Sequence, residues 1–403
     1  GSVFNNGWKL YAPTLFSYDD FIKIDYIWFS HEHPDHFYPP NLKKIKPEHK
    51  ENITVLFQDT IDKRVKEYCS KTGFKEVIEL KKKKHFEITP NFKVLCEHFK
   101  EGDSWICFKS AETTILNTND CGIRNKSDVK KIVDRLGNID ILMTQFSYAY
   151  WAGNPEDIEY RKNIAKQKLE GLKYQCDHFK PRVIIPIASY IYFCHEENRY
   201  LNDSINTPKD TYKFILDNVK SEPVILYNGE EYNFPKSHNS EQSIKKYNNQ
   251  LVSVLKDDSN FLKSNSFEIT RIMNAATQFI SNLNSTNSWF VKSLLKPSYV
   301  KFFESNEIFL LSRDGFNKVD SSPRVDVILS IECLLNCFEF PYGLDSVQIS
   351  GRLRKPREGN YSNFYNFFRI NQLKMRGINP NSVGYLIGAA FRKILFKFDL
   401  LKN

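Results

Sequence analysis

Three histidines, one glutamate and one aspartate occur within six residues, from His31 to His36, and no other feature constrains the fold of this chain as strongly. The cluster directly follows an apolar segment, residues 24–29, that predicts a buried strand. Imidazole and carboxylate groups are common protein ligands of zinc and non-haem iron. An extended loop at a strand end would turn His31 and His33 toward one metal ion and Asp35 and His36 toward its neighbour. The alternative, a solvated polar loop, does not explain this density of ligand groups.

Short apolar runs alternate with polar, helix-like stretches over the first part of the chain. Buried strands are predicted at residues 24–29, 53–57, 114–116, 139–143 and 183–186. Helices are predicted at residues 60–72, 126–136 and 157–178. This alternation predicts an α/β layered domain.

The length of 403 residues predicts two domains. A polar stretch near residues 234–249 indicates the boundary, so we expect a catalytic domain at residues 1–235, a linker at 236–250 and a second domain at 251–403. In the second domain, strands are predicted at 308–312, 325–331 and 346–350 and helices at 261–283 and 383–396, which predicts a smaller α+β domain. Scattered thiols at Cys333 and Cys337 have helical spacing and favour buried packing over ligation.

The composition indicates the cellular compartment of the protein and the classes of partner it could bind. No apolar run approaches the about 18 residues of a membrane span, and the N-terminus lacks a secretory signal pattern. The eight cysteines have no framework spacing, which favours free thiols in a reducing, cytoplasmic compartment. The net charge of +9 is spread along the chain. It therefore predicts no nucleic-acid partner, although it suits a small anionic substrate.

A strand followed by His-x-His-x-Asp-His resembles the signature of the metallo-β-lactamase superfamily. The resemblance implies an αββα sandwich that holds two metal ions at the edge of its sheets. It also implies a further histidine, a bridging carboxylate and a final histidine from later strand ends.

Three residues are candidates for these later ligands. His98 ends the segment Val94-Leu95-Cys96-Glu97-His98, although a hydrogen-bonded histidine at a strand end is the alternative. Asp120 ends an apolar strand two residues before a glycine, where the family has its bridging aspartate; turn capping is the alternative. His195 is the candidate for the last ligand, with a surface position as the alternative. Asp35 and Asp120 are the carboxylates expected to act in catalysis.

The segments around Pro186–Tyr190 and Cys194–Asn198 resemble one branch of the superfamily, the CMP-N-acetylneuraminate hydroxylase-like proteins. The segments Phe4–Trp8, Leu116–Cys121 and Gln145–Ser147 resemble the same branch, so the resemblance covers roughly residues 1–210. That branch carries a Rieske iron–sulfur domain, but no Cys-x-x-His occurs here, so we expect no Rieske cluster in this chain. The family has strands before its Trp-containing segment, which implies either a truncated start or a foreign Gly1-Ser2.

Ser147, Tyr148 and Trp151 follow a predicted strand and are expected to line a substrate pocket, with core packing as an equal alternative. The stretch 324–353 faintly resembles sterol-carrier-type domains. The second domain would shape the substrate entrance, bind an acyl portion of the substrate or form a homodimer, and the sequence leaves these roles open.

Two reactions fit the expected centre. With zinc or iron, a metal-bridging hydroxide would attack an ester, thioester or phosphoester. With two irons, the favoured choice because of the branch resemblance, the centre would activate dioxygen and hydroxylate a small anionic or carrier-linked substrate. That reaction needs electrons from a separate reductase or ferredoxin. A binding protein with an inactive site is a third hypothesis.

Overall fold

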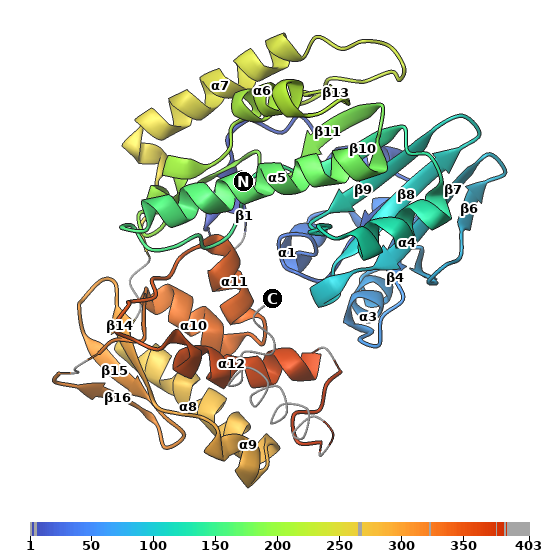
Figure 1. Ribbon diagram of the computed structural model, residues 1–403. Helices are drawn as coiled ribbons and strands as arrows, with labels where there is room; N and C mark the ends of the chain where they lie inside the picture. The colour runs from blue at the N-terminus through green and yellow to red at the C-terminus, as the bar shows by residue number, and fades with distance from the viewer. Residues whose placement is uncertain are drawn as a thin grey trace. The chain divides into compact units, whose positions relative to one another are not determined.

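The computed structural model describes residues 2–3, 6–264, 268–321, 324–375, 377–382 and 384. The chain divides into two compact units (Figure 1). Unit 1 comprises Gly1–Cys194 and Arg199–Leu262, and unit 2 comprises His195–Asn198 and Lys263–Asn403. None of the helices in the described ranges is long and apolar enough to cross a membrane.

Unit 1 contains two sheets that lie face to face. The smaller sheet is parallel, in the order β3 (Tyr26–Phe29), β4 (Thr54–Gln58) and β5 (Glu76–Leu80). The larger sheet has the order β13-β11-β10-β9-β8-β7-β6, with antiparallel pairing from β6 to β9 and parallel pairing from β9 to β13. Its strands are β6 Phe86–Thr89, β7 Phe92–His98, β8 Ser104–Ser110, β9 Thr114–Asn119, β10 Ile141–Gln145, β11 Val183–Ile187 and β13 Glu222–Pro223. A third, three-stranded sheet joins β1 (Ser2–Val3), β2 (Trp8–Leu10) and β12 (Ile191–Phe193).

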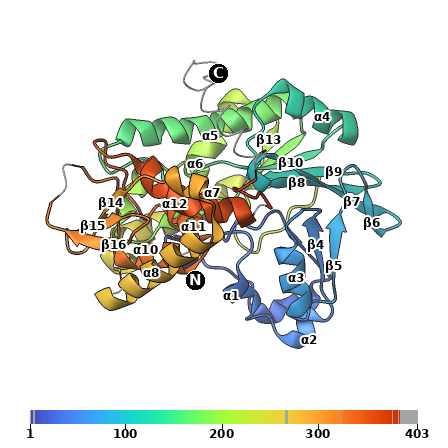
Figure 2. The same ribbon diagram turned by 90° about the horizontal axis from the view of Figure 1, so that it is seen from below.

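Three apolar cores separate the layers of unit 1. The middle core, between the two sheets, includes Leu56, Val94 and Ile106. The outer face of the smaller sheet packs on α1 (Pro39–Leu42) and α3 (Arg64–Lys71), and α2 (Pro47–Lys50) precedes β4 in the chain. The outer face of the larger sheet packs on α4 (Lys126–Leu136) and α5 (Ile158–Phe179). Figures 1 and 2 show these helices on the outer faces of the sheets. The structure confirms the predicted α/β fold class with αββα layers.

Helix α4 has the boundaries that the sequence predicts, for local reasons. The Asn125 side chain caps its N-terminus by accepting a hydrogen bond from Asp128 N, and Gly137 ends it with φ of 69°. Val129, Ile132 and Leu136 recur at helical spacing and are buried against the larger sheet. The other predicted strands and helices of unit 1 are present, with ends shifted by one to four residues.

The structure places the divide between the units later than the sequence-based boundary. Residues 236–250, expected to be a linker, largely belong to α7 (Ser240–Lys256), which follows α6 (Pro208–Asn218) in unit 1. Ile244, Tyr247 and Leu251 of α7 are buried in unit 1. These few apolar residues form one buried face of an amphipathic helix. The mostly polar composition of the stretch therefore led to the wrong prediction of a linker.

Unit 2 is an α+β domain, as predicted. Its sheet has the order β16-β15-β14-β17, with β14 Ser298–Phe302, β15 Ile308–Leu311, β16 Phe316–Val319 and β17 Val327–Leu329. Its helices are α8 Ile269–Thr286, α9 Trp289–Ser293, α10 Ile331–Glu339, α11 Gly343–Ser350 and α12 Tyr361–Met375. The rings of Phe279, Phe338 and Phe368 contact one another between α8, α10 and α12, with centroids 4.9–5.8 Å apart.

Three predictions for unit 2 need comment. The strand predicted at residues 346–350 is wrong, because this segment belongs to α11 and buries Leu344, Val347 and Ser350 at helical spacing. The helix predicted at 261–283 begins later, at Ile269, and continues to Thr286. The helix predicted at 383–396 lies outside the described residues, apart from residue 384.

Candidate metal centre

The histidine cluster lies in a tight loop after β3. The backbone N–H groups of His36 and Phe37 both donate to His33 O, at 2.9 and 2.8 Å, so the loop turns back on itself. The prediction of an extended loop at this position is therefore wrong. The turn brings the imidazoles together, because the ring centroid of His31 lies 4.5 Å from that of His33 and 4.2 Å from that of His36.

Two overlapping groups of side chains in this region have the spacing needed to hold a metal ion. One group is His31, Asp35 and His36, and the other is His31, His33 and Asp103. In each group the ligand atoms lie within 4.8 Å of one another. His31 belongs to both, so the two groups form one cluster rather than two separate sites.

Asp103 is the member of the cluster that sequence reasoning missed. It lies in the turn between β7 and β8, where Asp103 Oδ1 is 3.5 Å from His31 Nε2. His98, the ligand predicted from the same connection, is exposed at the end of β7 and belongs to neither group. The sequence signal that could have indicated Asp103 is its position directly after Gly102, since a glycine between two strand-like segments favours a turn. In the structure Gly102 indeed has a φ of 98°.

Asp120 joins the cluster through His36. It follows Asn119, which ends β9 in the left-handed conformation with φ of 47°. Asp120 Oδ2 lies 3.0 Å from His36 Nε2, and Asp120 Oδ1 accepts a hydrogen bond of 3.1 Å from Gln145 Nε2. The predicted strand-end aspartate is therefore beside the histidine cluster, as the parallel strands β9 and β10 end at the same edge.

Ser30 orients two of the histidines. Its Oγ lies 2.9 Å from His31 Nδ1 and 3.3 Å from His36 Nδ1, and it accepts a hydrogen bond of 2.8 Å from Asn119 Nδ2. Hydrogen bonding at Nδ1 fixes the ring orientation and leaves Nε2 as the ligand atom. The Nε2 atoms of His31 and His36 accordingly face Asp103 and Asp120.

The pKa values of His31 and His36 are shifted in opposite directions. Burial, reinforced by His36 and His33, lowers the pKa of His31 to about 2, so its imidazole is neutral near pH 7. Burial also opposes the charged form of His36, but the charge and hydrogen bond of Asp120 outweigh it and raise the pKa of His36 well above 6.5. Burial would raise the pKa of Asp120, yet His36 holds it below its usual range.

The αββα layers and the His-x-His-x-Asp-His segment at the end of β3 identify the fold. The chain has a metallo-β-lactamase-like fold. No family model matches the chain. Among solved structures, it is similar to the metallo-β-lactamase fold protein YhfI from Bacillus subtilis, with a TM-score of 0.34, 13% identity and coverage of 52% of this chain and 77% of that one. It is also similar to CmlA, a diiron β-hydroxylase from Streptomyces venezuelae, with a TM-score of 0.37, 13% identity and coverage of 50% and 43%.

Curated relatives match part of the chain. A protein of Mycolicibacterium smegmatis named as a Rieske 2Fe-2S iron–sulfur protein is 26% identical over 204 residues, which are 47% of this chain and 38% of that protein. The cytidine monophosphate-N-acetylneuraminic acid hydroxylase of Xenopus laevis is 24% identical over 220 residues, which are 51% of this chain and 36% of the hydroxylase. The chain therefore spans less than two fifths of the length of these relatives.

The residues of this metallo-β-lactamase-like fold suit a bound metal ion. His31 Nε2 and Asp35 Oδ1 are both buried and have no hydrogen-bond partner among the described residues. Leaving such polar atoms buried without a partner costs free energy, unless a ligand satisfies them. A neutral imidazole with a free Nε2 lone pair and a free carboxylate oxygen are the donors that zinc and iron bind.

Other predicted site residues have different surroundings. His195, the predicted last ligand, is buried in unit 2, and its Nδ1 lies 3.4 Å from Glu197 Oε1. It belongs to neither ligand group, because both groups consist of unit 1 residues.

The residues predicted to line a substrate pocket are largely buried. Ser147 is buried and its Oγ accepts a hydrogen bond from Asn206 N at 2.9 Å. Tyr148 is fully buried and donates a hydrogen bond of 2.6 Å to Leu201 O, as the packing alternative expects. Trp151 is half-buried.

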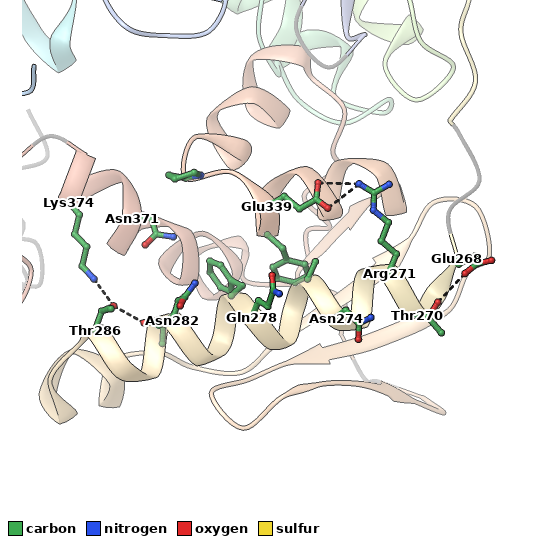
Figure 3. Close-up of a pocket in the computed structure, with 15 residues that line it drawn as sticks. Glu268, Thr270, Arg271, Asn274, Gln278, Asn282, Thr286, Glu339, Asn371 and Lys374 are labelled. Carbon is green, nitrogen blue, oxygen red and sulfur yellow. Dashed lines mark hydrogen bonds and ion pairs between the residues drawn. The ribbon is translucent and has the colours of Figure 1, made fainter. Parts of the chain in front are cut away.

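Unit 2 has a cavity of about 870 Å³ along α8, shown in Figure 3. An ion pair between Arg271 and Glu339 lies at one end, and a hydrogen bond from Lys374 Nζ to Thr286 Oγ1 lies at the other. None of the candidate metal ligands is among its lining residues.

Proposed function

We propose that this chain is a metal-dependent enzyme whose metal centre is held by three histidines and three carboxylates of unit 1. The proposed ligands are His31, His33, Asp35, His36, Asp103 and Asp120. The observation that carries the proposal is the position of His31, which belongs to both ligand groups and whose buried Nε2 lacks a hydrogen-bond partner among the described residues. Two ions sharing one cluster of ligands would account for both groups.

The donor set suits both iron and zinc, so the choice of iron rests on the curated relatives. Each of the two ligand groups consists of two imidazoles and one carboxylate. This combination occurs both in non-haem iron oxygenases and in catalytic zinc sites. The names of the curated relatives, a hydroxylase and an iron–sulfur protein, agree with oxidative chemistry. We therefore propose a di-iron hydroxylase that acts on a small anionic or carrier-linked substrate.

The iron ions would supply the activation of dioxygen, with one oxygen atom entering the substrate and the other leaving as water. Two electrons and two protons would balance this reaction, and a separate reductase or ferredoxin is the proposed electron donor. The chain's own residues would keep the ligands in place, as Ser30 does where its Oγ contacts Nδ1 of both His31 and His36.

A hydrolase is the second candidate, because three carboxylates and three imidazoles also suit a two-metal hydrolytic centre. The two candidates predict different metals and different reactants. Dioxygen consumption with an electron donor would be specific to the hydroxylase, and release of acid from an ester, thioester or phosphoester would be specific to the hydrolase.

Metal analysis by mass spectrometry tests the proposal on protein expressed with both iron and zinc available. We expect about two irons per chain in the wild type, and loss of metal without loss of fold in His33→Ala and Asp120→Ala. His85→Ala is the matched control, since His85 is exposed and distant in sequence from every proposed ligand. Two zincs would favour the hydrolase. Absence of metal in protein prepared with both metals would refute the metal centre.

A further inference from the structure

A chain of two hydrogen bonds leads from Asp120 to a cationic side chain that the proposed function does not use. Gln145, the last residue of β10, donates from Nε2 to Asp120 Oδ1 at 3.1 Å. The Oε1 atom of the same amide accepts a hydrogen bond from Lys168 Nζ, on α5. Asp120, Gln145 and Lys168 thus form a relay that connects the candidate metal centre with α5.

The chemistry of the two ends fixes the orientation of the amide between them. A lysine ammonium group only donates hydrogen bonds, and an ionised aspartate only accepts them. The amide oxygen of Gln145 must therefore face Lys168, and its NH₂ group must face Asp120. A reversed amide would place donor against donor and acceptor against acceptor, so both neighbours oppose rotation.

Lys168 is placed for this role. It is half-buried, and its Nζ lies 5.3 Å from the ring centroid of Tyr150. No carboxylate within the described part of the chain lies at ion-pair distance from Nζ, so the Gln145 amide is its direct polar contact. An ordinary surface lysine would instead extend into solvent or pair with a nearby acid on its helix.

We propose that Gln145 and Lys168 are positioning residues for the metal centre, which hold Asp120 so that its Oδ2 stays directed toward His36. The proposal rests on the proposed function, because it requires that Asp120 binds metal. Hydrogen-bonding partners of a metal ligand fix its orientation, and their loss typically weakens metal binding by roughly 10- to 100-fold.

The test measures Zn²⁺ affinity at pH 7 by competition with a chromophoric chelator, together with the visible spectrum of the Co²⁺-loaded protein. Gln145→Leu removes the amide, and Lys168→Met removes the donor that fixes it. Lys168→Arg keeps a side chain that only donates. Lys166→Met is the control, since Lys166 is exposed on the same helix.

We expect Gln145→Leu and Lys168→Met to bind Zn²⁺ roughly 10- to 100-fold more weakly than the wild type and to alter the Co²⁺ spectrum. We expect Lys168→Arg and Lys166→Met to stay within about threefold of the wild type. The melting temperature of the metal-free proteins reports folding separately, and if Gln145→Leu does not fold, the Lys168 variants decide.

Two results would count against the proposal in different ways. If the wild type binds Zn²⁺ but Lys168→Met binds equally or more tightly, charge repulsion outweighs positioning and the relay is refuted while the metal centre stands. If the wild type binds neither Zn²⁺ nor Co²⁺, the proposed function fails, and the relay fails with it.

Discussion

The choice between Asp103 and His98 as a metal ligand gives the sharpest test of the centre. Both residues belong to the connection between β7 and β8, but only Asp103 lies beside His31, with 3.5 Å between Oδ1 and Nε2. Asp103→Asn removes the negative charge and keeps the shape of the side chain. His98→Gln is the matched change at the exposed position.

The expected magnitude follows from Coulomb's law. A metal ion bound by the Asp103 carboxylate would lie within about 4 Å of its charge, where two unit charges interact by about 4 kcal/mol at an effective dielectric constant of about 20. Since about 1.4 kcal/mol corresponds to a tenfold change in affinity, Asp103→Asn should weaken metal binding by about a thousandfold. His98→Gln should change the affinity by less than about threefold, because no proposed ligand group includes His98.

Metal content per chain and a Zn²⁺ titration at pH 7 would measure both variants. The expected result is loss of metal from the Asp103 variant and retention by the His98 variant. The opposite result would show that the ligand assignment made from the loop geometry is wrong, and that the histidine predicted from sequence binds the metal.

Three further predictions concern stability and the thiols. Burial would raise the pKa of Asp203, but hydrogen bonds and nearby positive charge, chiefly from Arg161, outweigh burial and lower it. This pair therefore stabilises the fold above about pH 4, and the stabilisation is lost as the pH falls below it. Urea unfolding should therefore show that Asp203→Asn costs about 1–3 kcal/mol at pH 7, since Asp203 is partly exposed, and much less at pH 3. Arg352→Met should destabilise unit 2 by about 3–5 kcal/mol in the same assay, because it leaves the buried Glu197 and the partly buried Glu332 without their cation; an unchanged midpoint would contradict this. A thiol reagent should react with almost none of the eight buried cysteines in the native protein and with all eight after denaturation, whereas rapid native reaction would show that the core is open.

Much of the fold could be predicted because unit 1 obeys simple periodicity. Its strands are apolar runs bounded by polar turns, and helices such as α4 carry both a cap and an apolar face. The prediction of a strand at residues 346–350 failed because Val347 and its neighbours alternate over only five residues. Such a short run does not distinguish a strand from a helix. The structure shows a helix, in which Leu344 and Val347, three residues apart, are buried on the same face.

The part of the site encoded in one loop could be predicted, whereas the parts contributed by distant turns could not. His31, His33, Asp35 and His36 stand next to one another in sequence, and one backbone turn brings them together. Asp103 depends on where β7 ends and how the hairpin turns, which the residue types alone do not specify. A five-residue difference therefore separated the predicted ligand His98 from the aspartate beside His31.

Ser30 explains why the ligand cluster and the sandwich depend on each other. Its carbonyl oxygen accepts hydrogen bonds from Gln58 Nε2 at 2.9 Å and from Ser104 Oγ at 2.5 Å, which come from β4 of the smaller sheet and β8 of the larger one. Its hydroxyl contacts both His31 and His36. A shift of either sheet would therefore move the residue that orients two histidines, and a metal ion held by those histidines would in turn stabilise the packing of the sheets, because a ligand that binds only the folded state adds to its stability.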